Sequence, residues 1–341
     1  MNQIEHFSWK DISDFSPEFF KKIYFNNNKC EFADYFQHNI IPVYDANKLD
    51  FNNTDALESI YKNFFNNTGV FIVKNAYKST IMDNLNEWFF DNLENSKKDL
   101  NSKHPKQSGK YLINDVIGRM SETEPELLIQ LLANNKLTMI IDLLLGFSKY
   151  GSATAHIISE GGDRQKSHVD YPGHIGSGLF WENSIQKFKK LTTRYQTNNI
   201  LPYYSVQVLI ATQYMDINNG STEVIPGSHL IDDLDIKIHN KKIYDSFEDL
   251  FLNVTLQKGD YLVFNRRICH RGGKNLSNKP RNSLILQCIW LWGISQEIID
   301  SEKVINYLNK TKYYSNLNDI QKSEFIMRLK SPYPINVKKN T

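Results

Sequence analysis

The sequence predicts a mainly β protein with flanking helices, in which short strands form a barrel or a sandwich. Two observations support this prediction. Apolar residues recur at helical spacing through much of the first 150 residues, whereas later residues form short β-rich runs. Turn residues separate these later runs at regular intervals, and many short strands joined in this way are typical of barrels and sandwiches.

The first part of the chain, residues 1–150, is expected to be mainly helical. Residues 55–65 have apolar side chains at helical spacing and end at Asn67-Thr68-Gly69. The short apolar run at 70–73 then predicts a strand, and residues 79–100 predict a second helix. A third helix is expected to begin near Pro125, a residue suited to the first helical turn, and to run towards Gly146.

The second part of the chain contains the predicted strands. They lie at 153–159, 204–214, 223–225, 252–256, 261–264 and 282–290. Neither a Pro- or Gly-rich linker nor an internal repeat divides the chain, so we expect one domain over 1–341. Within it we place a strand-rich core at 151–295 and a helical tail at 296–341.

Composition and charge restrict the expected partners. Charged residues make up 23% of the chain and the net charge is +2, with no long run of Lys or Arg, so nothing favours nucleic acid. No apolar run approaches the ~20 residues of a membrane helix, and the first residues do not resemble a signal peptide. The three cysteines, Cys30, Cys269 and Cys288, lie far apart, which favours a reducing compartment. We therefore expect a cytoplasmic protein without a membrane partner.

A candidate metal site begins with His168 and Asp170. On a strand, residues two apart point to the same face, so both side chains can reach one metal ion. Taken alone the pair is a weak signal, because the chain has nine histidines. His270, at the end of the run 261–270, offers a third ligand. Two histidines and one carboxylate form the facial triad of non-haem Fe(II) oxygenases, but zinc hydrolases use a similar set.

Arg281 distinguishes between these two chemistries. It lies eleven positions after His270 (281 − 270 = 11) and opens the next apolar strand. A planar guanidinium binds a carboxylate through two parallel hydrogen bonds. An oxygenase that oxidises 2-oxoglutarate needs such an anchor, whereas a zinc hydrolase gives Arg281 no role.

Three blocks of the chain resemble the phytanoyl-CoA dioxygenase family, within a resemblance from about Gly69 to Trp290. The blocks are His168-Val169-Asp170, then Asn219-Gly220-Ser221-Thr222-Glu223-Val224-Ile225-Pro226-Gly227-Ser228-His229, then Lys258-Gly259-Asp260-Tyr261-Leu262-Val263-Phe264 with His270, Asn275, Ser277 and Arg281. The resemblance implies a double-stranded β-helix, the cupin-like jelly roll, with N-terminal helices packed on the sheet. It also implies Fe(II), 2-oxoglutarate and O₂ as cofactors. His168, Asp170 and His270 then match the metal ligands and catalytic centre, and Arg281 matches the 2-oxoglutarate anchor.

The chain departs from the family at Gly272, where many relatives have a serine or another small residue whose hydroxyl helps to hold the co-substrate. We expect Tyr204, Gln207 or a water molecule to supply that hydrogen bond. His156 lies near the place where relatives have a polar residue that contacts 2-oxoglutarate, and a structural role for it is an equal alternative. His229 follows a Pro-Gly turn and is interpreted as structural rather than as a fourth metal ligand.

The resemblance also implies a reaction. Because Asp170 completes the triad, we expect hydroxylation of a small-molecule substrate with release of succinate and CO₂. Related halogenases replace this carboxylate by a small residue, which argues against halogenation here, while desaturation and ring closure stay open. Two other functions also stay open: a catalytically inactive β-helix binding protein, and a zinc-dependent hydrolase on the same barrel.

The segment between Asp170 and Tyr203 is the candidate substrate lid. Its aromatic and basic side chains suit a metabolite that carries an acid, such as an amino acid or a biosynthetic intermediate. The candidate substrate contacts are Tyr171, His174, Phe180, Trp181 and Arg194.

Overall fold

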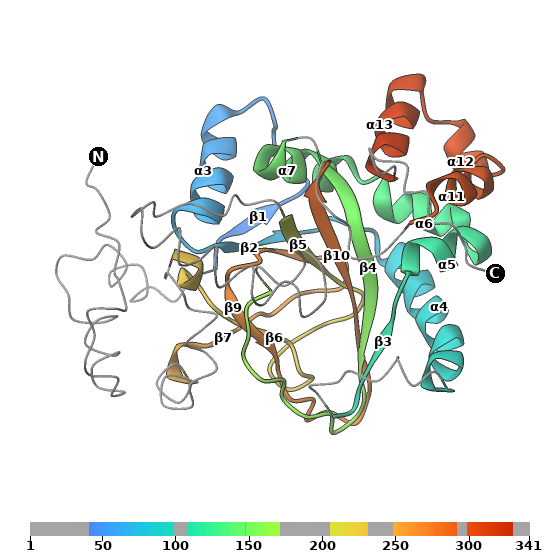
Figure 1. Cartoon of the computed structure of the whole chain (residues 1–341). Helices are drawn as coiled ribbons and strands as arrows, with labels where there is room; N and C mark the ends of the chain where they lie inside the picture. The colour runs from blue at the N-terminus through green and yellow to red at the C-terminus, as the bar shows by residue number, and fades with distance from the viewer. Residues whose placement is uncertain are drawn as a thin grey trace, which may run out of the picture.

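The computed structural model describes residues 41–98, 108–146, 148–170, 205–230, 248–291 and 299–329. The described strands form two sheets (Figure 1). The large sheet has seven strands in the order β1-β2-β8-β5-β10-β4-β3, and the small sheet has three in the order β7-β6-β9. The predicted strand-rich core with flanking helices is therefore confirmed.

The large sheet draws its strands from both parts of the chain. The strands β1 and β2 are parallel and all other described pairs are antiparallel. The small sheet is antiparallel and consists of β6 (Thr222–Ile225), β7 (Leu252–Asn253) and β9 (Cys269–Gly272). The strands of the large sheet are β1 (Val43–Asp45), β2 (Val70–Lys74), β3 (Lys110–Ile113), β4 (Ser148–Ile158), β5 (Ser205–Ala211), β8 (Tyr261–Asn265) and β10 (Arg281–Trp290).

The helices of the first part begin and end at recognisable signals. Helix α3 (Thr54–Phe65) is capped by the side chain of Asn53, which accepts hydrogen bonds from the backbone N–H groups of residues 55 and 56. Helix α4 (Ser79–Lys98) matches the second predicted helix. Helix α5 (Val116–Thr123) was not predicted, and it precedes the region of the third prediction.

The third predicted helix is instead two helices, α6 (Pro125–Leu132) and α7 (Asn135–Leu145). The break occurs because Asn134 adopts an extended backbone and its side chain caps α7 by accepting from the N–H of Leu137 at 3.1 Å. In the described part of the chain no single helix is long and apolar enough to span a membrane, and only α6 and α7 together meet that criterion, with a bend of 51° between them.

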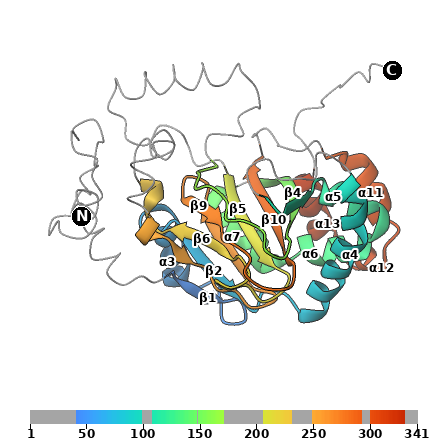
Figure 2. The same cartoon turned by 90° about the horizontal axis from the view of Figure 1, so that it is seen from below.

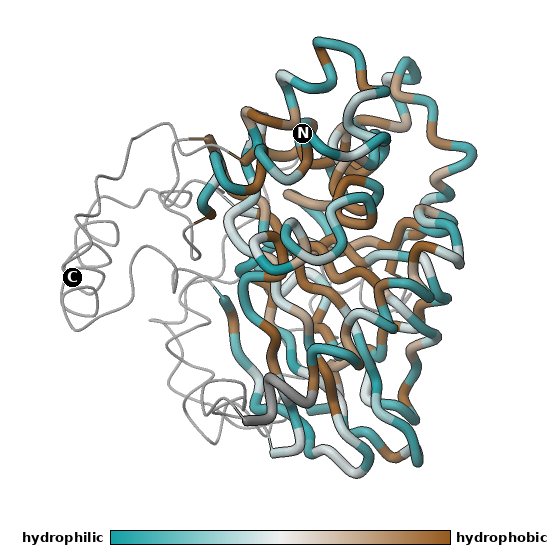
Figure 3. Tube along the Cα trace, turned by 90° about the vertical axis from the view of Figure 1, so that its right-hand side faces the viewer, coloured by the Kyte–Doolittle hydropathy of each residue, from teal (hydrophilic) through white to brown (hydrophobic). Residues whose placement is uncertain are grey.

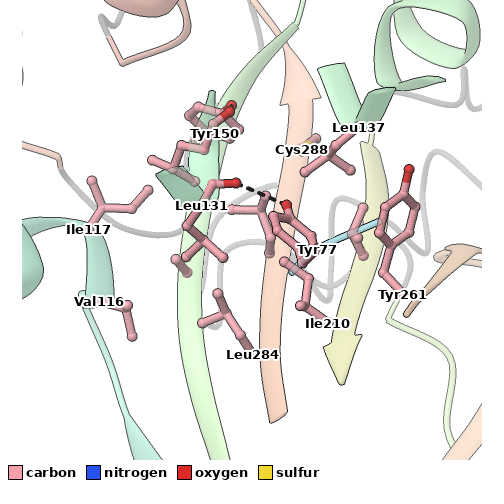
Figure 4. Close-up of a cluster of buried hydrophobic side chains, with 14 of the residues drawn as sticks. Tyr77, Val116, Ile117, Leu131, Leu137, Tyr150, Ile210, Tyr261, Leu284 and Cys288 are labelled. Carbon is pink, nitrogen blue, oxygen red and sulfur yellow. Dashed lines mark hydrogen bonds between the residues drawn. The ribbon is translucent and has the colours of Figure 1, made fainter. Parts of the chain in front are cut away.

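The main apolar core lies between the helices and one face of the large sheet (Figures 3 and 4). It includes Phe89 of α4, Leu131 of α6, Val208 of β5 and Leu284 of β10. Tyr77 is buried in this core, where its hydroxyl donates to the carbonyl of Leu131 at 2.9 Å. Three C-terminal helices lie beside α5 and α6 (Figure 1). They are α11 (Ser301–Leu308), α12 (Lys312–Ser315) and α13 (Asp319–Leu329).

The other face of the large sheet points towards the small sheet, and we call it the inner face (Figure 2). An apolar cluster fills part of the space between the sheets, and it includes Leu209 of β5, Leu262 of β8 and Val224 of β6. Because side chains alternate along a strand, the inner face of β10 carries residues 281, 283, 285, 287 and 289. Several of these are polar, and they surround the candidate site.

Candidate metal centre and its surroundings

His168, Asp170 and His270 converge on one point. One ligand atom from each of the three side chains lies within 4.8 Å of the others. The backbones of His168 and His270 exchange two hydrogen bonds, of 3.0 and 2.9 Å, and the N–H of Asp170 donates to the carbonyl of Arg266 at 3.0 Å. Residues 168–170 therefore lie along β9 and the turn before it, which brings together ligands a hundred residues apart.

The orientation of both imidazole rings is fixed by their Nδ1 atoms. Nδ1 of His168 lies 2.9 Å from the carbonyl of Lys166, and Nδ1 of His270 lies 3.0 Å from the carbonyl of Ile268. A carbonyl only accepts, so each Nδ1 carries the proton and each Nε2 keeps its lone pair. The two Nε2 atoms lie 3.7 and 3.6 Å from the carboxylate oxygens of Asp170, on the side where a metal would sit.

The protonation states also suit a divalent cation. Burial and the adjacent His270 lower the pKa of His168 to about 4, so this ring is neutral at pH 7. Burial alone would raise the pKa of Asp170, but His270, Arg266 and His168 outweigh it and hold this pKa below its usual range. The cluster thus offers neutral imidazole and carboxylate donors, which fit Fe(II) as well as zinc.

Gln207 supports the carboxylate ligand. It lies on the inner face of β5, where its Nε2 donates to Oδ2 of Asp170 at 2.9 Å. The sequence suggested that Gln207 contacts the co-substrate, whereas the structure pairs its amide nitrogen with Asp170. A hydrogen bond of this kind orients a ligating carboxylate and restricts its rotation.

Arg281 lies on the inner face at the start of β10, and it is only 3% exposed. It donates to the hydroxyl of Ser283 at 2.7 Å and to the carbonyl of Gly220 at 2.6 Å, which holds the guanidinium in place. Its Nε has no hydrogen-bond partner, and no described carboxylate pairs with it. This is the arrangement expected of an anchor for a carboxylate ligand.

A second buried cation, Lys110, lies in the same row of the sheet. Ile158 of β4 pairs with Lys110 of β3 on one side and with Arg281 of β10 on the other, so both cations share the inner face. Lys110 is 5% exposed. Its pKa falls to about 7, chiefly because of burial and then because of Arg281, while Asp170 acts in the opposite direction.

Sequence reasoning missed Lys110 and Ser283. Ser283 had an available signal, because it lies two residues after Arg281 on a predicted strand and so shares its face. Lys110 had none, because its place depends on the register of β3 against β4. His156 lies next to Ser283 across β4 and β10, on the face of Arg281. Tyr204 and the candidate substrate contacts Tyr171, His174, Phe180, Trp181 and Arg194 lie outside the described residues.

Two other positions have structural roles. Gly272 of β9 donates its N–H to Oε1 of Gln165 at 3.1 Å, and beside Arg281 a hydroxyl is supplied by Ser283. His229 is buried, and its Nε2 lies 3.2 Å from the carbonyl of Phe65. It packs so closely against Gly69 that a Cβ there would meet the imidazole ring.

The two-sheet fold and the site define a protein with a two-histidine, one-carboxylate cluster that could hold a metal ion, beside a buried arginine without a carboxylate partner among the described residues. Residues 159–283 match the model of the phytanoyl-CoA dioxygenase (PhyH) family, and this segment includes all three candidate ligands and Arg281. The resemblance found in the sequence motifs is therefore confirmed. The family depends on Fe(II), 2-oxoglutarate and O₂.

Solved structures with a similar fold include two proteins from nogalamycin biosynthesis. The non-heme alpha ketoglutarate dependent carbocyclase SnoK from nogalamycin biosynthesis has 16% identity and a TM-score of 0.50, over 72% of this chain and 86% of that chain. The epimerase SnoN in complex with Fe3+, alpha ketoglutarate and nogalamycin RO has 13% identity and a TM-score of 0.49, over 76% of this chain and 91% of that chain. At such identities the similarity concerns the fold alone. No curated protein matches the chain.

Proposed function

We propose that the protein is a non-haem Fe(II)- and 2-oxoglutarate-dependent oxygenase that hydroxylates a small-molecule substrate, with its site inside a double-stranded β-helix. The observation that carries this proposal is the placement of two buried cations, Arg281 and Lys110, on the inner face of the large sheet, which contacts the His168, Asp170 and His270 cluster through Gln207. A metal centre explains the three ligands, and a dicarboxylate co-substrate explains the cations.

Each residue then has a role. Nε2 of His168, Nε2 of His270 and the carboxylate of Asp170 hold the metal, and Gln207 keeps that carboxylate in position. Iron bound there supplies activation of O₂ coupled to oxidative decarboxylation of 2-oxoglutarate. Arg281, held by Ser283 and Gly220, binds the distal carboxylate, and Lys110 adds a second positive charge. Burial strengthens these charge interactions because it removes competing water.

Hydroxylation is the proposed outcome because Asp170 fills the third protein position on the metal. A halide would need the position on the metal that Asp170 occupies, so halogenation is not proposed. Because the structurally similar SnoK is a carbocyclase, product analysis should detect ring closure and desaturation as well as hydroxylation. The residues proposed to contact the substrate are those of the segment after Asp170, chiefly Tyr171, His174, Phe180, Trp181 and Arg194.

Formation of succinate from 2-oxoglutarate in the presence of Fe(II) and O₂ tests the proposal. We expect His168→Ala and Asp170→Ala to abolish it, because each removes a metal ligand. Arg281→Ala should raise the requirement for 2-oxoglutarate roughly 30- to 150-fold, since a charged hydrogen-bonded contact contributes about 2–3 kcal/mol.

The alternatives give different results. A zinc hydrolase would act with Zn(II) and without O₂. An inactive binding protein would make no succinate. If Fe(II) with 2-oxoglutarate under anaerobic conditions does not perturb the protein at all, the oxygenase proposal is wrong.

A further inference from the structure

A second group of buried polar residues lies on the inner face, further along the strands from Arg281. Gln287 of β10 pairs with Gln207 of β5 on one side and with Ser152 of β4 on the other. Two residues further along β10, Ile289 lies between Ser205 of β5 and Lys149 of β4. Directly opposed residues of an antiparallel pair point to the same face, so all these side chains face the small sheet.

Of the two cations in this group, Lys149 has no acidic partner, and Arg266 has only Asp170 nearby. Lys149 is 3% exposed and makes no hydrogen bond or ion pair with a described residue. Arg266 is 1% exposed, and its guanidinium reaches only the hydroxyl of Ser205, at 3.5 Å, and the backbone carbonyl of Asp170, at 3.3 Å. The charge of Arg266 is the more deeply buried of the two, and a buried charge with so few partners is costly unless a ligand of opposite charge binds.

Several buried polar atoms of the group are also left unpaired. Ser152 donates to Oε1 of Gln287 at 3.1 Å, but Nε2 of Gln287 has no partner. Oε1 of Gln207 and Nε of Arg266 are likewise buried without a hydrogen bond. Buried polar atoms are nearly always bonded in folded proteins, so donors and an acceptor gathered here indicate a place for a polar ligand.

The charge balance of the inner face also favours an anionic ligand. The described inner-face cations are Lys110, Lys149, Arg266 and Arg281, and Asp170 is the one carboxylate that acts on any of them. A divalent metal and a dianionic co-substrate cancel each other, so binding both would leave this excess of positive charge uncompensated. A further anion would balance it.

The two groups lie at different points along β10. Residues 281 and 287 are six positions apart, roughly 20 Å between their Cα atoms at the rise of a β-strand. Gln207, which pairs with Gln287, also bonds to Asp170, so the group around Gln287 lies beside the metal ligands. We assign the group around Arg281 to 2-oxoglutarate, which leaves the group around Gln287 for a second anion.

We propose that Lys149 and Arg266 bind an anionic group of the substrate that is oxidised, either a carboxylate or a phosphate, while Gln287 and Gln207 bond to its polar neighbours. The substrate class is thus a small anionic molecule. This inference rests on the proposed function, because it assigns the group around Arg281 to 2-oxoglutarate.

Thermal unfolding of the full chain tests the proposal. The protein is first saturated with Mn(II), which does not turn over, and with 2-oxoglutarate. Acetate, inorganic phosphate and neutral acetamide are then titrated at constant ionic strength. We expect one of the two anions to raise the Tm saturably in the millimolar range, by about 3 °C at tenfold excess over its Kd, and acetamide to have no such effect.

Matched variants locate the effect. Lys149→Gln and Arg266→Gln should each reduce the anion-dependent shift at least threefold. Lys136→Gln, which removes a lysine that donates to the carbonyl of Leu49 away from the site, should keep the shift. Arg266→Lys, which retains the charge next to Asp170, should keep part of it.

The outcomes separate this proposal from the proposed function. A response to acetate alone indicates a carboxylate substrate, and a response to phosphate alone indicates a phosphate ester. If 2-oxoglutarate stabilises the protein but no anion adds a saturable shift, or if the shift persists in both Lys149→Gln and Arg266→Gln, the second site does not exist. If 2-oxoglutarate with Mn(II) fails to stabilise the protein, the proposed function fails first.

Discussion

At the scale of single residues, the metal centre depends on the hydrogen bond from Gln207 to Asp170. Loss of a partner that orients a metal ligand typically lowers metal affinity about 10- to 100-fold. We therefore expect Gln207→Leu to weaken Mn(II) binding by this factor in isothermal titration calorimetry, while the carboxylate itself stays in place. The control is Gln287→Leu, which removes the glutamine of β10 that lies directly opposite Gln207. It should alter the Mn(II) affinity by less than about threefold. Equal losses in the two variants would contradict the role given to Gln207.

Lys110 makes a prediction about pH. Its pKa is about 7 in the folded protein, where it faces Arg281 of β10 and the carboxylate of Asp170, and the ordinary value is 10.5. The unfolded chain therefore binds more protons at Lys110 between about pH 7 and 10.5, so this residue makes the ligand-free protein more stable as the pH rises through that window. Lys110→Met should remove this contribution, which urea unfolding at pH 7 and pH 9.5 measures.

Lys110 should also make the affinity for 2-oxoglutarate depend on pH, but this affinity should fall as the pH rises. A dianion favours the protonated amine, so affinity should fall as the pH rises above about 7, and Lys110→Met should lower it roughly tenfold at pH 6.5. Lys136→Met is the control, because that lysine donates to the carbonyl of Leu49 away from the site. A pH profile that is the same in wild type and Lys110→Met would contradict this account.

At the scale of the elements, the turn before β6 fixes the position of Arg281. Gly220 has a φ of +81°, and a Cβ there would lie 3.0 Å from the carbonyl oxygen of Gly273 and 3.1 Å from the N of Asn275. Gly220→Ala should therefore cost about 1–3 kcal/mol of stability and also weaken 2-oxoglutarate binding, because the carbonyl of Gly220 accepts from Arg281.

A second glycine separates these two effects. Gly161 also has a positive φ, of +67°, but a Cβ there would meet nothing within 4 Å. Gly161→Ala should cost only about 1 kcal/mol in urea unfolding and leave the affinity for 2-oxoglutarate unchanged. An equal loss of affinity in both variants would show that the turn of Gly220 has no special part in holding Arg281.

The elements also show where sequence reasoning reaches its limit. Apolar periodicity was enough to predict α3, α4 and β2, because each depends on its own residues. It did not predict the break between α6 and α7, since the apolar pattern continues through Asn134. The pairing of β3 with β4 could not be predicted either, because it depends on packing between strands far apart in the chain.

At the scale of the whole molecule, the site assembles side chains from distant segments, and this decides which of its residues are predictable. His168, Asp170, His270 and Arg281 lie in local motifs with fixed spacing. Lys110 lies 171 residues before Arg281 (281 − 110 = 171) and enters the site only through sheet register. Lys149 and Arg266 have the sequence surroundings of ordinary surface residues, yet the fold buries both.

The proposed metal ligands lie on residues 168–170 and on β9, and the proposed 2-oxoglutarate anchor lies on β10. Binding of the metal and of 2-oxoglutarate should therefore stabilise the whole fold and not one loop. At a hundredfold excess over its Kd, a ligand adds about 2.7 kcal/mol, which corresponds to roughly 4 °C in Tm for a chain of 341 residues. We expect Mn(II) to raise the Tm, 2-oxoglutarate to raise it further, and EDTA to reverse both shifts. Asp170→Ala should lose both increments, and Arg281→Met should lose only the second. An increment from 2-oxoglutarate that survives in Arg281→Met would mean that the co-substrate is anchored elsewhere.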